Sequence, residues 1–204
     1  MSNLVSDPEQ LLGKARAGDS PALGQLLEMY RNYLVLLARM QIGRRLQGKV
    51  DGADLVQGTF LAAHRDFARF RGTTEKELVS WLRGILAANL IDLVRRYCGA
   101  RRRDIRLERQ LADDLDRSSQ AFGLILAAHH SSPSQQAVRR EQAVLLADAL
   151  KNLPPDYSEV IVLHHLEGQT FPEVSRRMMR SLDSVKKLWV RALARLRDTL
   201  GDYS

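Results

Sequence analysis

Apolar residues recur at intervals of three and four along most of the chain, which is the period of a helix that buries one side. Alternating β-branched stretches of the kind that form strands are not visible. Proline is absent between Pro21 and Pro133, in a stretch rich in Leu, Ala and Arg. The pattern therefore predicts an all-α protein. Helices are expected at about residues 7–17, 20–42, 52–70, 75–97, 136–152, 155–166, 170–178 and 182–200.

The helical pattern weakens after Tyr97 and returns at about residue 136. Between these points, residues 101–135 contain an arginine cluster, several aspartates and the run SSPSQQ, with room for a short helix at Ala121–Ala128. Such a composition is typical of a flexible linker. We therefore expect two small helical domains, at residues 1–100 and 136–204, joined by a linker at residues 101–135.

The last predicted helix contains SLDSVKKLWVRALARLR, with apolar residues on one side and mostly small or cationic residues on the other. Ser181 can cap its first turn. The preceding segment is TFPEVSRRMM, in which Thr170 and Glu173 have the spacing of a capping box and Pro172 falls in the first turn. A short turn separates the two helices, so we expect a helix-turn-helix, whose second helix enters the DNA major groove.

The charge distribution favours nucleic acid as the partner of this motif. The chain has 204 residues and a formal net charge of +7, from 31 Lys and Arg against 24 acids. Residues 176–197 alone contain eight basic residues and one acid, whereas a merely soluble surface mixes both signs. We expect Arg176, Arg177 and Arg180 to suit phosphates, and Ser184, Lys187 and Arg191 to reach base edges.

Two helices of the N-terminal domain carry polar faces of their own. In DLVQGTFLAAHRDFARF, Asp54, Gln57 and Leu61 share a face, and an exposed leucine beside a carboxylate and an amide suggests a protein contact. In the next helix, Asn89, Asp92 and Arg96 stand at spacings of three and four. Residues 95–109 contain seven arginines and two acids. Because asparagine can read bases and arginines can hold phosphates, we expect a second nucleic-acid contact here.

Several other classes of protein find little support. The single Cys98 permits no internal disulfide and no multi-cysteine zinc site. His164, His165 and Glu167 lack the spacing of a helical metal site, and no phosphate-binding loop or nucleophile elbow is visible. We therefore expect no enzyme activity, cofactor or metal. No signal peptide is visible, and no apolar run approaches the roughly 20 residues of a membrane span, which predicts a cytoplasmic protein without membrane insertion.

Three segments resemble bacterial RNA polymerase sigma factors, in particular the compact extracytoplasmic-function (ECF) group. They are DLVQGTFLAAHR, SWLRGILAANLIDLVRR and LKNLPPDYSEVIVLHHLEGQTFPEVSRRMMRSLDSVKKLWVRALARL, and they occur in the family's order. The resemblance covers most of residues 7–97 and 136–200. It implies that a sigma region 2-like domain docks on core RNA polymerase and binds the melted minus-ten promoter element. A sigma region 4-like domain would read the minus-thirty-five element.

The resemblance also implies which residues act. Polymerase binding falls to Asp54, Gln57 and Leu61, and minus-ten DNA binding to Asn89, Asp92, Arg95 and Arg96. Minus-thirty-five DNA binding falls to Arg176, Arg177, Arg180, Ser181, Ser184, Lys186, Lys187 and Arg191. Many family members are held inactive by an anti-sigma factor, which makes one a candidate partner beside core RNA polymerase and promoter DNA.

The chain departs from the family pattern at three positions. The family usually has Glu at the position of Gly58, a basic residue at Ala88, and Gly in the helix-turn-helix at Met179. Because a methionine adopts the left-handed backbone conformation only at a cost, we expect a tighter or differently shaped turn there.

Two other functions stay open on the sequence alone. A stand-alone helix-turn-helix regulator would bind duplex DNA as a dimer without polymerase. A partner-binding module with incidental charge would bind neither DNA nor polymerase through these residues.

Overall fold

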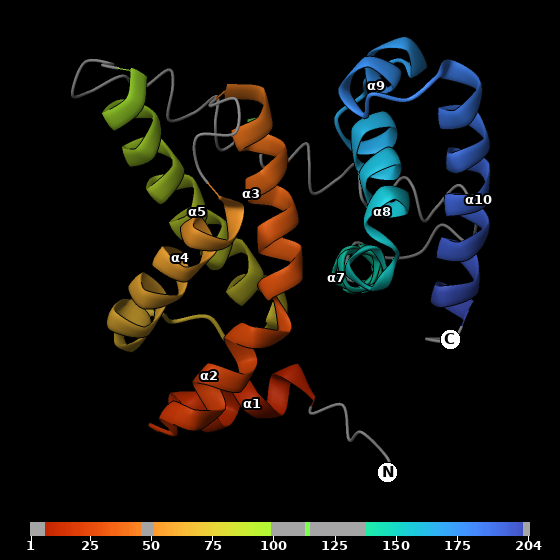
Figure 1. Ribbon diagram of the computed structural model, residues 1–204. Coiled ribbons are helices and arrows are strands. Elements are labelled where there is room, and N and C mark those ends of the chain that lie inside the picture. The colour runs from red at the N-terminus through yellow and green to blue at the C-terminus, as the bar shows by residue number, and fades with distance from the viewer. Residues whose placement is uncertain (1–6, 46–50, 99–112, 115–137, 202–204) are drawn as a thin grey trace. The chain divides into compact units, whose positions relative to one another are not determined.

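A computed structural model of the chain describes residues 7–45, 51–98, 113–114 and 138–201 (Figure 1). These residues form helices and contain no strand, so the all-α prediction is confirmed. The chain divides into two compact units, Met1–Asp116 and Arg117–Ser204. The linker expected at residues 101–135, with its short helix and most of its arginine cluster, lies almost wholly outside the described residues.

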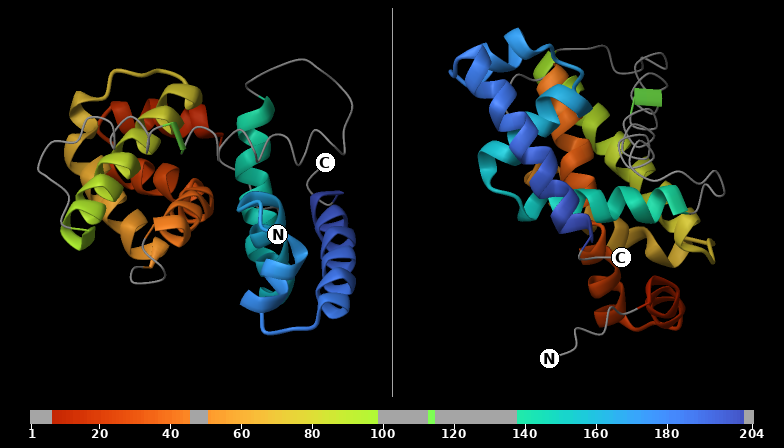
Figure 2. Two further views of the ribbon diagram at one scale, coloured as in Figure 1. Left: turned by 90° about the horizontal axis from the view of Figure 1, so that it is seen from above. Right: turned by 90° about the vertical axis from the view of Figure 1, so that its right-hand side faces the viewer.

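The first unit is built around three long helices. Its elements are α1 (Pro8–Arg16), α2 (Ser20–Met29), α3 (Arg31–Arg45), α4 (Gly52–Asp66), the 3-10 turn η1 (Phe67–Arg69) and α5 (Glu75–Cys98). Helices α3, α4 and α5 pack against one another, and α1 packs against α2 (Figures 1 and 2). The core leucines include Leu34, Leu37, Leu82, Leu86 and Leu90, all fully buried. This packing holds one face of α4 against α5.

The single helix expected at residues 20–42 is in fact two helices that meet at Tyr30, so that prediction was wrong. Tyr30 is 1% exposed, and its hydroxyl donates a hydrogen bond to a Glu75 carboxylate oxygen 2.9 Å away. Burial, and then the Glu75 carboxylate, raise the pKa of Tyr30, so the phenol remains a neutral donor. Neither proline nor glycine stands at this break. A tertiary contact holds it, while the apolar period continues through it.

The second unit packs its helices against the long C-terminal one. Its elements are α7 (Val138–Asn152), α8 (Pro155–Ile161), the π-helical turn η2 (Val162–Leu166), α9 (Phe171–Arg177) and α10 (Leu182–Gly201). Helices α7, α8 and α9 all contact α10. Fully buried side chains at this junction include Leu146, Val160, Ile161, Val174, Val185 and Ala192. The core therefore fixes the buried side of α10 and leaves its basic side open.

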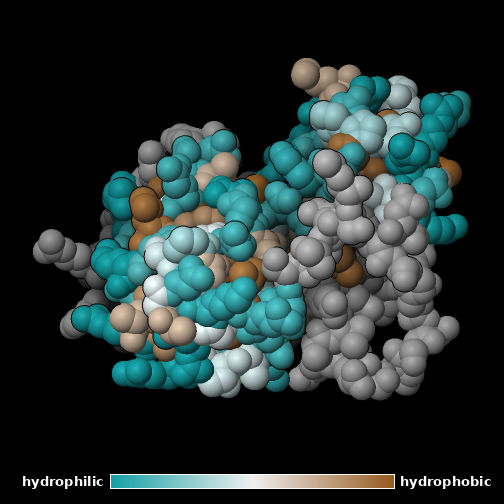
Figure 3. Space-filling model, turned by 90° about the horizontal axis from the view of Figure 1, so that it is seen from below, coloured by the Kyte–Doolittle hydropathy of each residue, from teal (hydrophilic) through white to brown (hydrophobic). Residues whose placement is uncertain are grey.

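Few large hydrophobic side chains are exposed among the described residues. On the face drawn in Figure 3, hydrophobic residues appear as small separate areas among hydrophilic ones. Among the described residues, the large hydrophobic side chains that are exposed are Leu61, Met179, Leu182 and Val190. One lies on α4, and the other three lie on α10 or in the turn before it. Within the described part of the chain, no helix has both the length and the apolar character of a membrane span.

Candidate nucleic-acid interface

Side-chain caps fix the start of both helices in the helix-turn-helix. The Glu173 carboxylate accepts hydrogen bonds from the backbone N–H and the hydroxyl of Thr170, each at 2.7 Å, which confirms the predicted capping box. These hydrogen bonds lower the pKa of Glu173, and the bond from the Thr170 backbone N–H is the largest cause. At the start of α10, the Ser181 hydroxyl oxygen accepts from the Ser184 backbone N–H at 3.2 Å. The sequence therefore sets where each helix begins.

The turn between the helices has the shape that a glycine would give it. Met179 has a φ of 53°, in the left-handed region, and its side chain is 92% exposed. The expectation that methionine would exclude this conformation was wrong. Neighbouring contacts hold the turn: the Ser175 hydroxyl donates to the Arg180 carbonyl oxygen, and the Arg180 guanidinium forms an ion pair with Asp156 of α8. These contacts offset the backbone strain at Met179.

The open side of α10 carries the cationic residues expected to reach DNA. Lys186, Lys187 and Arg191 are exposed, and Ser184 is half-buried. Lys187 Nζ lies 2.8 Å from an Asp183 carboxylate oxygen one turn earlier. Within the described part of the chain, the Arg191 guanidinium takes part in no side-chain hydrogen bond or ion pair, so it is available to a ligand. Arg176 and Arg177 are exposed on α9, whereas Arg180 is engaged with Asp156.

Two apolar residues on the same helix were not singled out from the sequence as candidates for binding. Leu182 and Val190 are exposed on α10, among the cationic side chains. Apolar groups in a major groove can contact the methyl group of thymine. Val190 falls opposite the buried stripe of α10, which is the signal that could have marked it.

The two adjacent histidines belong to an aromatic cluster that supports α10. Trp189 Nε1 donates a hydrogen bond to His165 Nε2 at 3.0 Å, and the His164 ring stacks on Phe171 with centroids 4.1 Å apart. His164 Nδ1 lies 2.8 Å from the Gln169 carbonyl oxygen. Among the described residues, no three His, Cys, Asp or Glu side chains gather where they could hold a metal ion. The cluster connects η2, α9 and α10.

Helix α4 presents the three residues that the sequence assigned to a protein contact. Asp54 and Gln57 are exposed, and Leu61 is 67% exposed on the same face. The Asp51 carboxylate caps the helix by accepting from the Ala53 backbone N–H at 2.9 Å. Because the opposite face is buried in the core, this face is the part of α4 that a partner can reach.

Helix α5 presents an amide, a carboxylate and two guanidinium groups. Asn89 is half-buried, and Asp92 and Arg96 are exposed further along the helix. Arg95 is half-buried, and its Nη1 lies 3.4 Å from an Asp92 carboxylate oxygen. The four predicted residues therefore lie within two turns of one helix, with Asn89 and Arg95 half-buried and Asp92 and Arg96 exposed.

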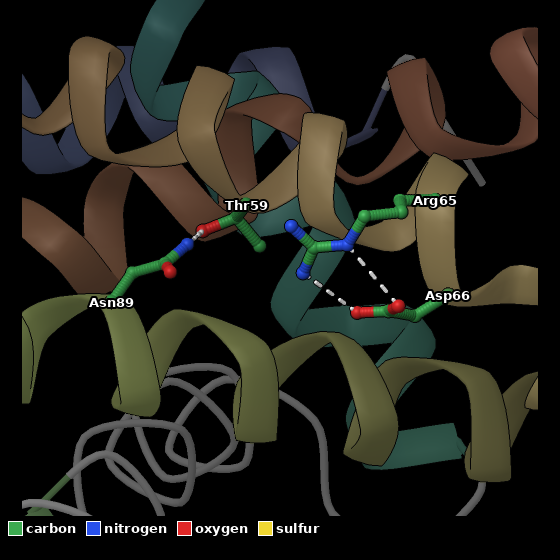
Figure 4. A network of polar contacts seen from close by, with 4 residues as sticks. All are labelled: Thr59, Arg65, Asp66 and Asn89. Carbon is green, nitrogen blue, oxygen red and sulfur yellow. Dashed lines mark hydrogen bonds and ion pairs between the residues drawn. The ribbon is translucent and has the colours of Figure 1, made fainter.

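Thr59 of α4 contacts this surface from the neighbouring helix, and it is not among the site residues predicted from the sequence. Asn89 Nδ2 donates a hydrogen bond to Thr59 Oγ1 at 3.1 Å (Figure 4). Thr59 is 0% exposed, and its own hydroxyl donates to the Leu55 carbonyl oxygen at 2.9 Å. The available signal was a polar residue among the buried apolar residues of α4, between Val56 and Ala63.

The chain is similar to known proteins both in its second unit alone and over most of its length. Residues 143–196 match the family model described as Sigma-70, region 4, and these residues include α8, α9 and most of α10. Over 192 residues the chain is 26% identical to the ECF RNA polymerase sigma-E factor of Haemophilus influenzae, covering 94% of each chain. It is 30% identical to the RNA polymerase sigma factor CarQ of Myxococcus xanthus, covering 79% of this chain and 81% of the relative. It is 33% identical to the RNA polymerase sigma-E factor of Streptomyces antibioticus, covering 74% and 71%.

Proposed function

Because the chain belongs to the extracytoplasmic-function group of RNA polymerase sigma factors, we propose that it recruits core RNA polymerase to specific promoters and helps to open the DNA there. This proposal is supported by two matches taken together, one to whole sigma factors and one to the region 4 family model. Relatives that the chain matches over most of their length are sigma factors, and the region 4 family model falls on the helix-turn-helix. A stand-alone regulator would explain the second match and leave the first without a reason.

The two units divide the work between them, with domains at residues 1–100 and 136–204 joined through residues 101–135. The face of α4 formed by Asp54, Gln57 and Leu61 docks on core RNA polymerase, supported by the exposure of all three side chains. The α5 surface, formed by Asn89, Asp92, Arg95 and Arg96, binds the melted minus-ten element. The helix-turn-helix binds the minus-thirty-five element through Arg176, Arg177, Arg180, Ser181, Ser184, Lys186, Lys187 and Arg191.

The chemistry of this function is binding alone. The chain makes and breaks no covalent bond, and it stabilises the opened strand by holding bases and phosphates. Its place of action is the cytoplasm, where promoter DNA and polymerase meet. An anti-sigma factor is a further expected partner, because many proteins of this group are held inactive by one.

Reconstitution with bacterial core RNA polymerase tests the function directly. We expect the purified chain to co-elute with core polymerase in size exclusion and to direct run-off transcription from specific promoters of a genomic library. Binding to duplex DNA as a dimer, without co-elution, would instead support a stand-alone regulator. A chain that binds neither polymerase nor DNA would support a partner-binding module.

The polymerase contact has a matched pair of variants. Leu61→Ala removes an exposed leucine of α4, and we expect core affinity to fall by about 1–2 kcal/mol without loss of thermal stability, since the side chain is already in solvent. Val190→Ala removes an exposed apolar side chain of α10 and should leave core affinity unchanged. Equal core affinities for Leu61→Ala and the wild type would place the polymerase contact elsewhere.

A further inference from the structure

The polar contact between α4 and α5 holds the Asn89 side chain in one orientation, and we propose that Thr59 is the positioning residue that aims this carboxamide at the promoter strand. The inference rests on the proposed contact of Asn89 with the melted minus-ten element. Thr59 itself is 0% exposed, so it cannot touch DNA and acts only through Asn89.

The direction of two hydrogen bonds decides which end of the amide faces Thr59. A threonine hydroxyl has a single hydrogen, and Thr59 donates it to the Leu55 carbonyl oxygen at 2.9 Å. The hydroxyl oxygen is then available to Asn89 only as an acceptor. Asn89 therefore presents its NH2 group to Thr59, with 3.1 Å between Nδ2 and Oγ1. In Figure 4 the carboxamide oxygen points away from Thr59.

A fixed carboxamide discriminates between bases in a way that a rotating one does not. Each base edge offers hydrogen-bond donors and acceptors in a set order. An asparagine that turns over freely can match either order, because its oxygen and nitrogen exchange places. With the NH2 group held by Thr59, the oxygen of Asn89 stays on the open side. The site then favours bases whose edge places a donor opposite that oxygen.

Gly58 leaves the approach to this amide open. A Cβ atom at position 58 would lie 3.9 Å from Asn89 Nδ2, which is ordinary van der Waals contact. A longer side chain would start beside the amide, and a carboxylate on it would offer an acceptor to the second N–H of the Asn89 amide. The chain therefore combines a fixed amide with free space next to it.

Two substitutions of Thr59 separate its hydroxyl from its bulk. Thr59→Val removes the acceptor at nearly constant volume, and Thr59→Ser retains it. Each variant is reconstituted with core RNA polymerase and mixed with single-stranded DNA selected from a randomised pool by the wild-type holoenzyme. Fluorescence anisotropy then measures affinity with each base changed in turn. We expect Thr59→Val to lose about 3- to 10-fold of base discrimination at one position, with Thr59→Ser close to the wild type.

Asn89→Ala, alone and combined with Thr59→Val, tests whether Thr59 affects base discrimination through Asn89. Discrimination should fall at the same position in Asn89→Ala, and adding Thr59→Val to it should cause no further loss. An unchanged profile for Thr59→Val, beside an altered one for Asn89→Ala, would overturn the role of Thr59 and leave the Asn89 contact intact. An unchanged profile for Asn89→Ala would remove the base contact, and the positioning role with it.

A measurement on the unmodified chain keeps the inference testable if Thr59→Val does not fold. Nuclear Overhauser contacts between the Asn89 side-chain NH2 protons and the Thr59 methyl group should be visible by NMR. Their absence would overturn the fixed orientation, even if the chain binds polymerase and promoter DNA as proposed. Their presence in a chain that binds no polymerase would show the orientation and refute the function.

Discussion

The two proposed DNA-binding helices hold their polar side chains in different ways. On α5, the amide of Asn89 is hydrogen-bonded to Thr59, a buried residue of the neighbouring helix. On α10, the lysine closest to an acid pairs within its own helix, Lys187 with Asp183. The α5 surface is therefore positioned by packing between helices. The α10 surface is positioned by the placement of its helix as a whole.

This difference suggests a division between selectivity and attraction. A long exposed side chain such as Lys187 or Arg191 loses up to about 1.5–2 kcal/mol of rotamer freedom when it is fixed, whereas a preoriented amide loses less. Long cationic side chains do attract phosphates from a distance and release counterions on binding. We therefore expect α5 to contribute more discrimination for each contact and α10 to contribute more salt-dependent affinity.

The largest expected effect comes from the cationic side of α10. Arg191→Ala should weaken binding to minus-thirty-five duplex DNA by about 1–3 kcal/mol if the guanidinium reads a base. Lys187→Ala should weaken it less, because Lys187 gives up its ion pair with Asp183 when it binds DNA. Affinity of the reconstituted holoenzyme for duplex DNA, measured at several salt concentrations, gives both values.

The same measurement can contradict the assignment of Arg191. A loss that is equal for all sequences, with a salt dependence reduced by about one phosphate contact, would mean that Arg191 holds the backbone. Equal losses for the two variants would mean that the Asp183 pair has no influence on binding. For comparison, Asn89→Ala should change discrimination and leave the salt dependence unchanged, since the amide carries no charge.

Local patterns in the sequence were enough to predict most helices and the exposed cationic residues of α10. Helical period, caps and charge are properties of neighbouring residues, and the buried stripe of α10 follows from them. The contact of Tyr30 with Glu75 spans 45 residues, and that of Asn89 with Thr59 spans 30. Such pairs depend on how helices pack, which no periodic pattern contains. The break at Tyr30 and the role of Thr59 were missed for this reason.

Met179 is a different kind of failure, because the local rule pointed the wrong way. Methionine disfavours a left-handed backbone, yet the structure places it there. The surrounding contacts, Ser175 with the Arg180 carbonyl and Arg180 with Asp156, impose the turn. One contact within the turn and one with α8 thus overrode a residue preference of about 1–2 kcal/mol.

Met179→Gly should remove the backbone strain at this position without changing DNA binding. Glycine adopts the left-handed conformation without steric cost, and the exposed methionine side chain contributes no packing that would be lost. After allowing for the greater freedom of glycine in the unfolded chain, we expect the free energy of unfolding of the second unit to rise by about 0.5–1 kcal/mol. Urea denaturation measures this value.

Met178→Gly is the matched control for that substitution. Met178 has a right-handed backbone and is half-buried, so glycine there should lower stability. DNA affinity of Met179→Gly should remain at the wild-type level, because the contacts of Ser175 and Arg180 still place α10. Lower affinity together with higher stability would mean that the left-handed methionine itself contributes to DNA binding.

The smallest expected effect is the loss of stability when a glutamate that caps the start of α5 or α9 loses its charge. Glu77 accepts hydrogen bonds from the backbone N–H groups of Thr73 and Thr74 and from the Thr74 hydroxyl, and Glu173 accepts from Thr170. These hydrogen bonds lower the pKa of both glutamates. The largest cause is the bond from the Thr73 backbone N–H for Glu77 and the bond from the Thr170 backbone N–H for Glu173. A carboxyl group whose pKa is lower in the folded state stabilises that state fully above its unfolded pKa. The stabilisation is lost as the pH falls through the folded pKa.

Each glutamate should therefore support its own unit near neutral pH and lose this effect in acid. Glu77→Gln and Glu173→Gln keep a side-chain oxygen as acceptor but remove the charge, so each should lower the urea midpoint of one unit near pH 7. NMR signals of the two units report these midpoints separately. The gap between variant and wild type should close as the pH falls through the lowered folded-state pKa, because the wild-type carboxyl groups then also become neutral. A gap that persists in acid would mean that the geometry of the cap, rather than its charge, stabilises the start of the helix.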